Sequence, residues 1–182
     1  MLTQKLRERL KKKLNSDVLD IIVFGSSVKG RIFPGDIDLC VIVKDSADIF
    51  RVQRNFDDVR EEAQITFVKL KDLLEKHLLL KQALVHEGFS LRFDEFVHKL
   101  IGFDAFTIFT FSLTNLAQSE KIRFQYALYG RGKEGGILKK CKGEKLGRGV
   151  IAVPVEFEAE IEDFFKLWRT EYKKERVLRA VS

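Results

Sequence analysis

The segment LDIIVFGSSVKGRIFPGDIDLCVIV, residues 19–43, decides the fold. It begins and ends with apolar runs that predict two buried strands, residues 19–24 and 36–43. Asp36 and Asp38 are one residue apart at the start of the second strand, so their side chains point to the same face. Charged side chains are unusual at the start of a buried strand. Shared binding of a divalent cation, Mg²⁺ or Mn²⁺, would explain these two carboxylates.

The turn after the first strand suits a phosphate group. Gly25 has no Cβ, so the backbone can turn tightly and a phosphate can approach it. If a helix starts at Ser26 or Ser27, its free N–H groups and the two hydroxyls face that phosphate. A serine-capped helix followed by an ordinary Pro-Gly turn is the alternative, and it is common in proteins of any function.

The full spelling of residues 24–31, followed after a short spacer by Pro34-Gly35-Asp36-Ile37-Asp38-Leu39, resembles the signature of the DNA polymerase beta nucleotidyltransferase superfamily. The resemblance is to its minimal nucleotidyltransferase branch and covers roughly residues 1–92. It implies a metal-dependent transfer of a nucleoside monophosphate from a triphosphate such as ATP to a hydroxyl acceptor, with Asp36 and Asp38 as catalytic metal ligands. It also implies that the Gly-Ser pair, Gly25 and Ser26, helps to hold the triphosphate, and we expect Ser27 to bind it as well. Lys29 and Arg31 are further candidates to contact the triphosphate; the alternative for each is a solvated turn residue.

One position departs from this family pattern. The family usually carries a third carboxylate on the strand at residues 64–70, and here that position is assigned to Thr66. A neutral hydroxyl is a poor metal ligand and cannot act as a general base near neutral pH. Glu61 and Glu62, a few residues upstream, are the substitutes. A catalytically degenerate fold that binds nucleic acid or a partner, or an antitoxin-like role, therefore stays open beside the enzyme.

Composition indicates a folded intracellular protein. The 182 residues are 45% hydrophobic, enough for one large or two small domains. No apolar run reaches the roughly eighteen residues of a membrane span, so we expect a cytoplasmic protein with no membrane partner. Cys40 and Cys141 show neither metal-ligand spacing nor a disulfide framework. The oligomeric state stays open.

Positive charge is concentrated in one segment. Residues 121–149 carry nine basic and two acidic side chains, a balance of +7 within a net charge of +6. Such a segment favours a polyanion partner, RNA or another nucleic acid, because neutralised phosphates release counterions. A solvated loop with ordinary surface lysines is the alternative. The predicted nucleic-acid-binding residues are Arg131, Lys133, Lys139, Lys140, Lys142, Lys145 and Arg148.

The predicted fold class is α/β (α+β). The first predicted domain, residues 1–92, has a small mixed sheet with covering helices. Its helices are expected at 2–14, 49–62 and 72–86, and its third strand at 64–70. The second, residues 93–182, is a mixed α+β region with a basic hairpin or loop and a role in acceptor or nucleic-acid binding. Its expected elements are a helix at 94–101, a strand or buried segment at 103–116, a helix at 115–130, paired strands at 137–140 and 149–153, and a last helix at 156–179.

Overall fold

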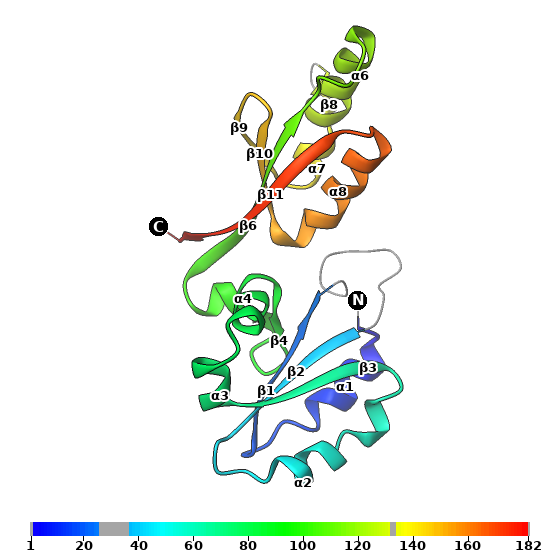
Figure 1. Ribbon diagram of the computed structural model, residues 1–182. Helices are drawn as coiled ribbons and strands as arrows, with labels where there is room; N and C mark the ends of the chain where they lie inside the picture. Colours follow the sequence, from blue (N-terminus) through cyan, green and yellow to red (C-terminus); the bar gives the residue numbers. More distant parts are fainter. Residues whose placement is uncertain (1, 26–36, 132–133, 182) are drawn as a thin grey trace. The chain divides into compact units, whose positions relative to one another are not determined.

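A computed structural model describes residues 2–25, 37–131 and 134–181. The chain forms two compact units, Met1–Phe103 and Asp104–Ser182, each with its own sheet and helices (Figure 1). The assignment of separate roles to residues 1–92 and 93–182 stays a prediction. Within the described ranges, no helix is long and apolar enough to cross a membrane.

The first unit is built on a five-stranded mixed sheet of order β3-β2-β1-β4-β5. β1 pairs antiparallel with β2 and β4, whereas β2 and β3 run parallel. A parallel pair needs a crossover connection, and α2 with the short helix η2 lies between β2 and β3 in the chain. The predicted mixed sheet is confirmed, and its three long strands agree with prediction to within one residue. The strands are β1 (Val18–Phe24), β2 (Ile37–Val43), β3 (Ala63–Lys69), β4 (Phe89–Ser90) and β5 (Glu95–Phe96).

Helices cover both faces of this sheet. On one face, α1 and α2 bury Leu10 and Val52 against alternate residues of the strands such as Leu39 and Val41. On the other face, α3 and α4 pack against Cys40 and its neighbours. The predicted helices were too long, because 49–62 ends early and 72–86 is split in two. The helices are α1 (Gln4–Lys11), α2 (Ile49–Arg54), η2 (Asp57–Val59), α3 (Leu70–Glu75), α4 (Leu78–Glu87) and α5 (Val97–Leu100).

The second unit has a four-stranded sheet of order β11-β6-β10-β9 and a small pair, β7 and β8. Its core is rich in aromatic rings, with Phe109, Phe124 and Phe165 fully buried. The predicted mixed α+β class is confirmed. A basic hairpin is present, but β9 and β10 form it, whereas the prediction paired residues 137–140 with 149–153. The elements are β6 (Phe103–Ser112), α6 (Gln118–Tyr129), β7 (Gly130–Arg131), β8 (Glu134–Gly135), α7 (Ile137–Lys140), β9 (Glu144–Gly147), β10 (Val150–Pro154), η3 (Val155–Phe157), α8 (Glu158–Leu167) and β11 (Glu171–Ala180).

The predicted strand at 137–140 is wrong, because this segment is the helix α7. Leu138 and Cys141 are both buried, and a spacing of three residues brings two side chains to one side of a helix but to opposite sides of a strand. The helix at 94–101 also proved shorter, since its first residues form β5.

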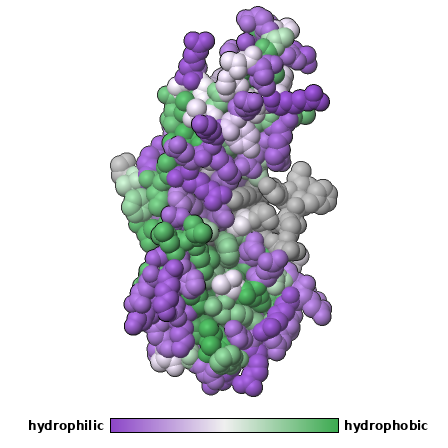
Figure 2. Space-filling model, in the orientation of Figure 1, coloured by the Kyte–Doolittle hydropathy of each residue, from purple (hydrophilic) through white to green (hydrophobic). Residues whose placement is uncertain are grey.

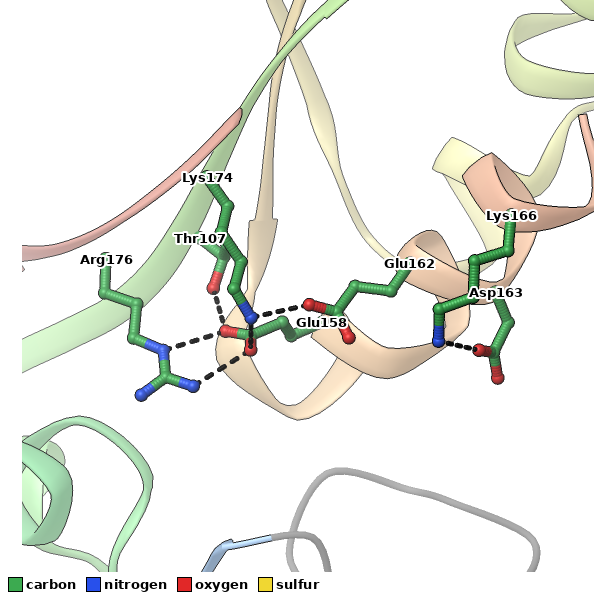
Figure 3. A network of polar contacts seen from close by, with 7 residues as sticks. All are labelled: Thr107, Glu158, Glu162, Asp163, Lys166, Lys174 and Arg176. Carbon is green, nitrogen blue, oxygen red and sulfur yellow. Dashed lines mark hydrogen bonds and ion pairs between the residues drawn. The ribbon is translucent and has the colours of Figure 1, made fainter. Parts of the chain in front are cut away.

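The predicted last helix, 156–179, is wrong in its second half. The helix α8 ends at Leu167, and β11 follows after a turn in which Arg169 has a φ of 51°. Lys174 and Arg176 are two residues apart, so in a strand both reach the same carboxylate, that of Glu158 at the start of α8 (Figure 3). A buried acid thus fixes the extended conformation, which the local sequence pattern alone did not indicate.

The Glu158 carboxylate is 1% exposed and receives hydrogen bonds from three side chains. The Lys174 ammonium donates to Oε1 at 2.8 Å, and the Arg176 guanidinium donates to both oxygens at 2.9 and 3.0 Å. The Thr107 hydroxyl donates to Oε2 at 2.7 Å. Although burial opposes it, hydrogen bonding to Glu158 and Glu162 raises the pKa of Lys174. This network joins α8, β6 and β11 through hydrogen bonds and ion pairs.

Candidate functional site

The candidate site begins where β1 ends beside the start of β2. Phe24 is the register partner of Asp38, so Gly25 follows directly beside this carboxylate. The backbone of Gly25 has a φ of +75°, a conformation that favours glycine. A Cβ built on Gly25 would lie 2.4 Å from Asp38 Oδ2. The carboxylate oxygen therefore occupies the space that only a glycine leaves open, and the structure brings these two predicted site residues together.

The strand β3 supplies the neighbour of Asp38 on its other side. In the parallel register, Asp38 is opposite Gln64, while Thr66 is opposite Cys40, two residues further into the strand. Thr66, the predicted position of the third carboxylate, is two residues from Gln64 on β3, so both lie on the same face of the strand. The assignment of Thr66 stays a prediction. Neither residue is an acid, so the departure from the family pattern holds at both positions.

The remaining predicted residues of this site lie outside the described residues. They are Ser26, Ser27, Lys29, Arg31 and Asp36. Within residues 2–25, 37–131 and 134–181, no three His, Cys, Asp or Glu side chains gather as a metal-binding group. The roles of these residues stay predictions.

The donor chemistry beside Gly25 suits a hard cation. Asp38 offers a carboxylate at the strand mouth, and its register neighbour Gln64 carries an amide oxygen. Carboxylate and amide oxygens are ligands of Mg²⁺, which usually keeps several waters and takes phosphate oxygens as well. One protein carboxylate with a neighbouring amide therefore fits a metal ion that arrives with a triphosphate, with Asp36 as the predicted second ligand.

The predicted substitutes for the missing acid, Glu61 and Glu62, are exposed. Glu62 forms an ion pair with Arg9, whose Nη1 lies 2.5 Å from its Oε1, and the role of both acids stays a prediction. Burial, with a smaller contribution from Asp20, raises the pKa of the Cys40 thiol to about 12. Burial likewise raises the pKa of Cys141 to about 11. Neither cysteine is therefore a thiolate nucleophile near neutral pH.

The predicted nucleic-acid-binding residues lie in the second unit and are spread over several elements. Lys145 and Arg148, from β9 and the β9–β10 turn, line a common cavity. Arg131 lies over the ring of Tyr126 at 5.3 Å, and Lys142 over that of Phe157 at 5.8 Å. Lys139 and Lys140 are exposed on α7, and Lys133 lies outside the described residues. On the face in Figure 2, hydrophilic side chains dominate the end of this unit that carries α6.

The fold is a mixed α+β type in which Gly25 lies against the Asp38 carboxylate. The chain matches the family model of the nucleotidyltransferase domain over residues 3–107, and it belongs to this family. The resemblance seen in the sequence is thereby confirmed. A search of curated proteins found no match.

The solved structures that are similar to this chain include three toxin-antitoxin structures. The first is a mutant MntA-HpeT toxin-antitoxin, 21% identical over 56% of this chain and 85% of that one, with a TM-score of 0.35. The second is a tri-AMPylated Shewanella oneidensis HEPN toxin with its MNT antitoxin, 24% identical over 54% and 84% of the chains, with a TM-score of 0.34. The third is a toxin-antitoxin with AMP-PNP, 24% identical over 53% and 82%, also with a TM-score of 0.34.

Proposed function

We propose that the chain is a metal-dependent nucleotidyltransferase that moves a nucleoside monophosphate from a nucleoside triphosphate onto a hydroxyl group of RNA. Membership of the nucleotidyltransferase family supports the reaction class. The observation that carries the proposal is the contact between Gly25 and Asp38. It sets a turn that requires glycine beside a carboxylate that can hold a cation.

In this proposal the residues of the glycine-serine turn and the acidic pair have separate tasks. Asp36 and Asp38 hold Mg²⁺ or Mn²⁺, which when bound would neutralise the charge of the triphosphate. The turn orients the triphosphate so that its α-phosphorus faces the acceptor. The residues proposed to hold the triphosphate are Gly25, Ser26, Ser27, Lys29 and Arg31.

The reaction forms one bond and breaks another. The acceptor oxygen bonds to the α-phosphorus while the bond from this phosphorus to the bridging oxygen breaks, and pyrophosphate leaves. The acceptor hydroxyl also loses a proton. Gln64 and Thr66 are neutral side chains that cannot take it near neutral pH, so the proton passes to water. We therefore expect slower transfer than an acid at position 64 would allow.

The neutral side chains on β3 favour a second candidate, a degenerate transferase fold that binds nucleic acid or a partner without catalysis. Thr66, the predicted position of the third carboxylate, and Gln64, the register partner of Asp38, both lack a carboxylate. Such a protein would keep the fold and the basic second unit but would transfer nothing. Retention of both Asp36 and Asp38 supports the enzyme, because adjacent carboxylates repel each other unless a cation or hydrogen bonds compensate.

The proposal is tested by calorimetric titration of ATP, CTP, GTP and UTP with Mg²⁺ into the wild type and Asp36→Asn/Asp38→Asn. The control is Asp57→Asn/Asp163→Asn, which removes the same charge at two exposed positions. Transfer is then followed with labelled nucleotide and total RNA. The enzyme proposal expects metal-dependent binding and labelled RNA in the wild type and control only. If no triphosphate binds, or RNA binds without becoming labelled, the degenerate module is the better description.

A further inference from the structure

The second unit contains a cavity of about 460 Å³, and no residue of the proposed transfer site lines it. Three segments line it: the end of β6 with the residues that follow, one side of α6, and the β9–β10 turn. Lys121, Gln125 and Tyr129 are four residues apart on α6, so they form a single stripe that faces the cavity. The volume lies within the range of small-molecule pockets, roughly 300–1,000 Å³.

Every charged side chain that lines this cavity is a cation. Lys121, Lys145 and Arg148 come from two separate segments and converge on one space. Among the described residues, none of these three forms an ion pair, whereas Lys174 and Arg176 of the same unit are bound to Glu158. Like charges brought together without acids repel one another, and an anionic ligand would offset this repulsion.

The other lining groups complete a surface for a phosphorylated aromatic ligand. Ser112 and Thr114 offer hydroxyl groups, 3.1 Å apart. Phe111 and Tyr129 supply aromatic rings. Because burial raises the pKa of Tyr129, its phenol stays neutral and can donate a hydrogen bond. Cations with hydroxyls suit phosphate oxygens, and aromatic rings suit a nucleobase.

The β9–β10 turn is held in place at the rim of this cavity. The Phe111 amide donates to the Gly149 carbonyl at 2.8 Å. Gly149 has a φ of +74°, and a Cβ there would lie 2.6 Å from the Phe111 carbonyl oxygen. The close approach therefore requires glycine, and it fixes Arg148 beside β6 before any ligand arrives. Such preorganisation lowers the entropic cost of binding.

We propose that this cavity binds one phosphorylated nucleotide unit, with its phosphate at Lys121, Lys145 and Arg148 and its base at the aromatic side. Such a unit comes either from a single strand of RNA or from a free mononucleotide. The idea that this cavity holds the acceptor RNA during transfer rests on the proposed function. The idea that the cavity binds a nucleotide does not.

The test compares two variants of the full chain that lose the same charge. Lys121→Gln/Lys145→Gln/Arg148→Gln removes the cations of the cavity, and Arg123→Gln/Lys166→Gln/Lys173→Gln removes three exposed cations of the same unit that do not line it. The probes are a labelled five-nucleotide RNA, followed by fluorescence anisotropy, and AMP, followed by calorimetry. We expect the cavity variant to bind at least tenfold more weakly, and the control to lose less than about threefold.

Single variants guard against a failure to fold. Gln125→Glu adds a carboxylate among the three cations, and Gln118→Glu adds one at an exposed position of the same helix. Only Gln125→Glu should weaken binding. If both probes lose affinity, the cavity takes free and strand-borne nucleotides; if only RNA does, it takes a strand. Equal losses in cavity and control variants, or no binding of either probe by the wild type, would overturn the proposal.

The result for nucleotide binding at the cavity can be distinguished from the result for the transfer reaction. Asp38→Asn should abolish transfer while leaving RNA and AMP affinity at the cavity unchanged, because the two sites share no residue. A chain without transferase activity can therefore still support the cavity proposal. An active chain whose cavity variant binds RNA as the control does would refute it.

Discussion

Replacement of Gly25 by alanine tests the geometry of the candidate site. The added Cβ would lie 2.4 Å from Asp38 Oδ2, where real Cβ contacts essentially never fall below 3.0 Å, so the oxygen must move by at least about 0.6 Å. The backbone also holds a φ of +75°, which costs an L-residue roughly 1–2 kcal/mol. Misplacement of a reacting group by about 1 Å can lower the reaction rate by 10²-fold. For the smaller shift of a metal-binding oxygen here, we expect Mg²⁺–nucleotide affinity to fall by roughly tenfold.

Gly102 provides a matched control within the same unit. Its φ is +81°, yet no heavy atom lies within 4 Å of the position of a Cβ. Gly102→Ala should therefore show the backbone penalty alone and keep nucleotide affinity. Stability is measured by urea unfolding with circular dichroism, while fluorescence of Trp168, the single tryptophan, reports the second unit and should not change.

A double variant completes the test. Gly25→Ala combined with Asp38→Ala removes the oxygen that the methyl group meets, so the two changes should couple by about 0.5–3 kcal/mol in the stabilising direction. Equal stability losses and equal nucleotide affinities for the Gly25→Ala and Gly102→Ala proteins would refute the proposed role of this contact.

Three further changes have defined outcomes. Glu158→Gln leaves two cations without their buried acid, so the second unit should lose roughly 3–5 kcal/mol in unfolding followed by tryptophan fluorescence; an unchanged midpoint would contradict the network's role. Hydrogen bonds from Lys11 and then Arg7 lower the pKa of Asp94. Its contribution is therefore present above the ordinary carboxyl pKa of 3.8 and lost as pH falls through the lowered value, so the stability gap between wild type and Asp94→Asn should close in acid and stay open at pH 7. Gln64→Glu adds an acid in register with Asp38 and should raise Mg²⁺ affinity and transfer rate; an equal gain from Thr66→Glu would place the third ligand elsewhere.

The sequence was sufficient for the three long strands of the first unit's sheet because each carries a strong local signal, whereas the short strands β4 and β5 were not predicted. The apolar runs at Val18–Phe24 and Ile37–Val43 are buried on both faces, a pattern that differs from any amphipathic helix. The contacts of Asp38 with Gly25 and with β3 were not predicted, because the pairing and register of strands depend on packing across the sheet.

The second unit was less predictable because long-range contacts decide its elements. β11 is extended because Lys174 and Arg176 bind Glu158, up to 18 residues away in the chain. The cavity is a further example: Lys121 was counted as one of many basic residues, and only the fold brings it to Lys145 and Arg148. Concentration of charge was visible in the sequence, but convergence on one space was not.

The most direct test of the central claim is incubation of the protein with Mg²⁺, α-labelled nucleoside triphosphate and RNA, with Asp38→Asn as the comparison. The proposed function predicts label on RNA and release of pyrophosphate by the wild type, both absent from Asp38→Asn, which should fold normally because the side-chain shape is kept. Absence of transfer from a wild-type protein that still binds RNA would contradict the claim and identify a binding module on a nucleotidyltransferase fold.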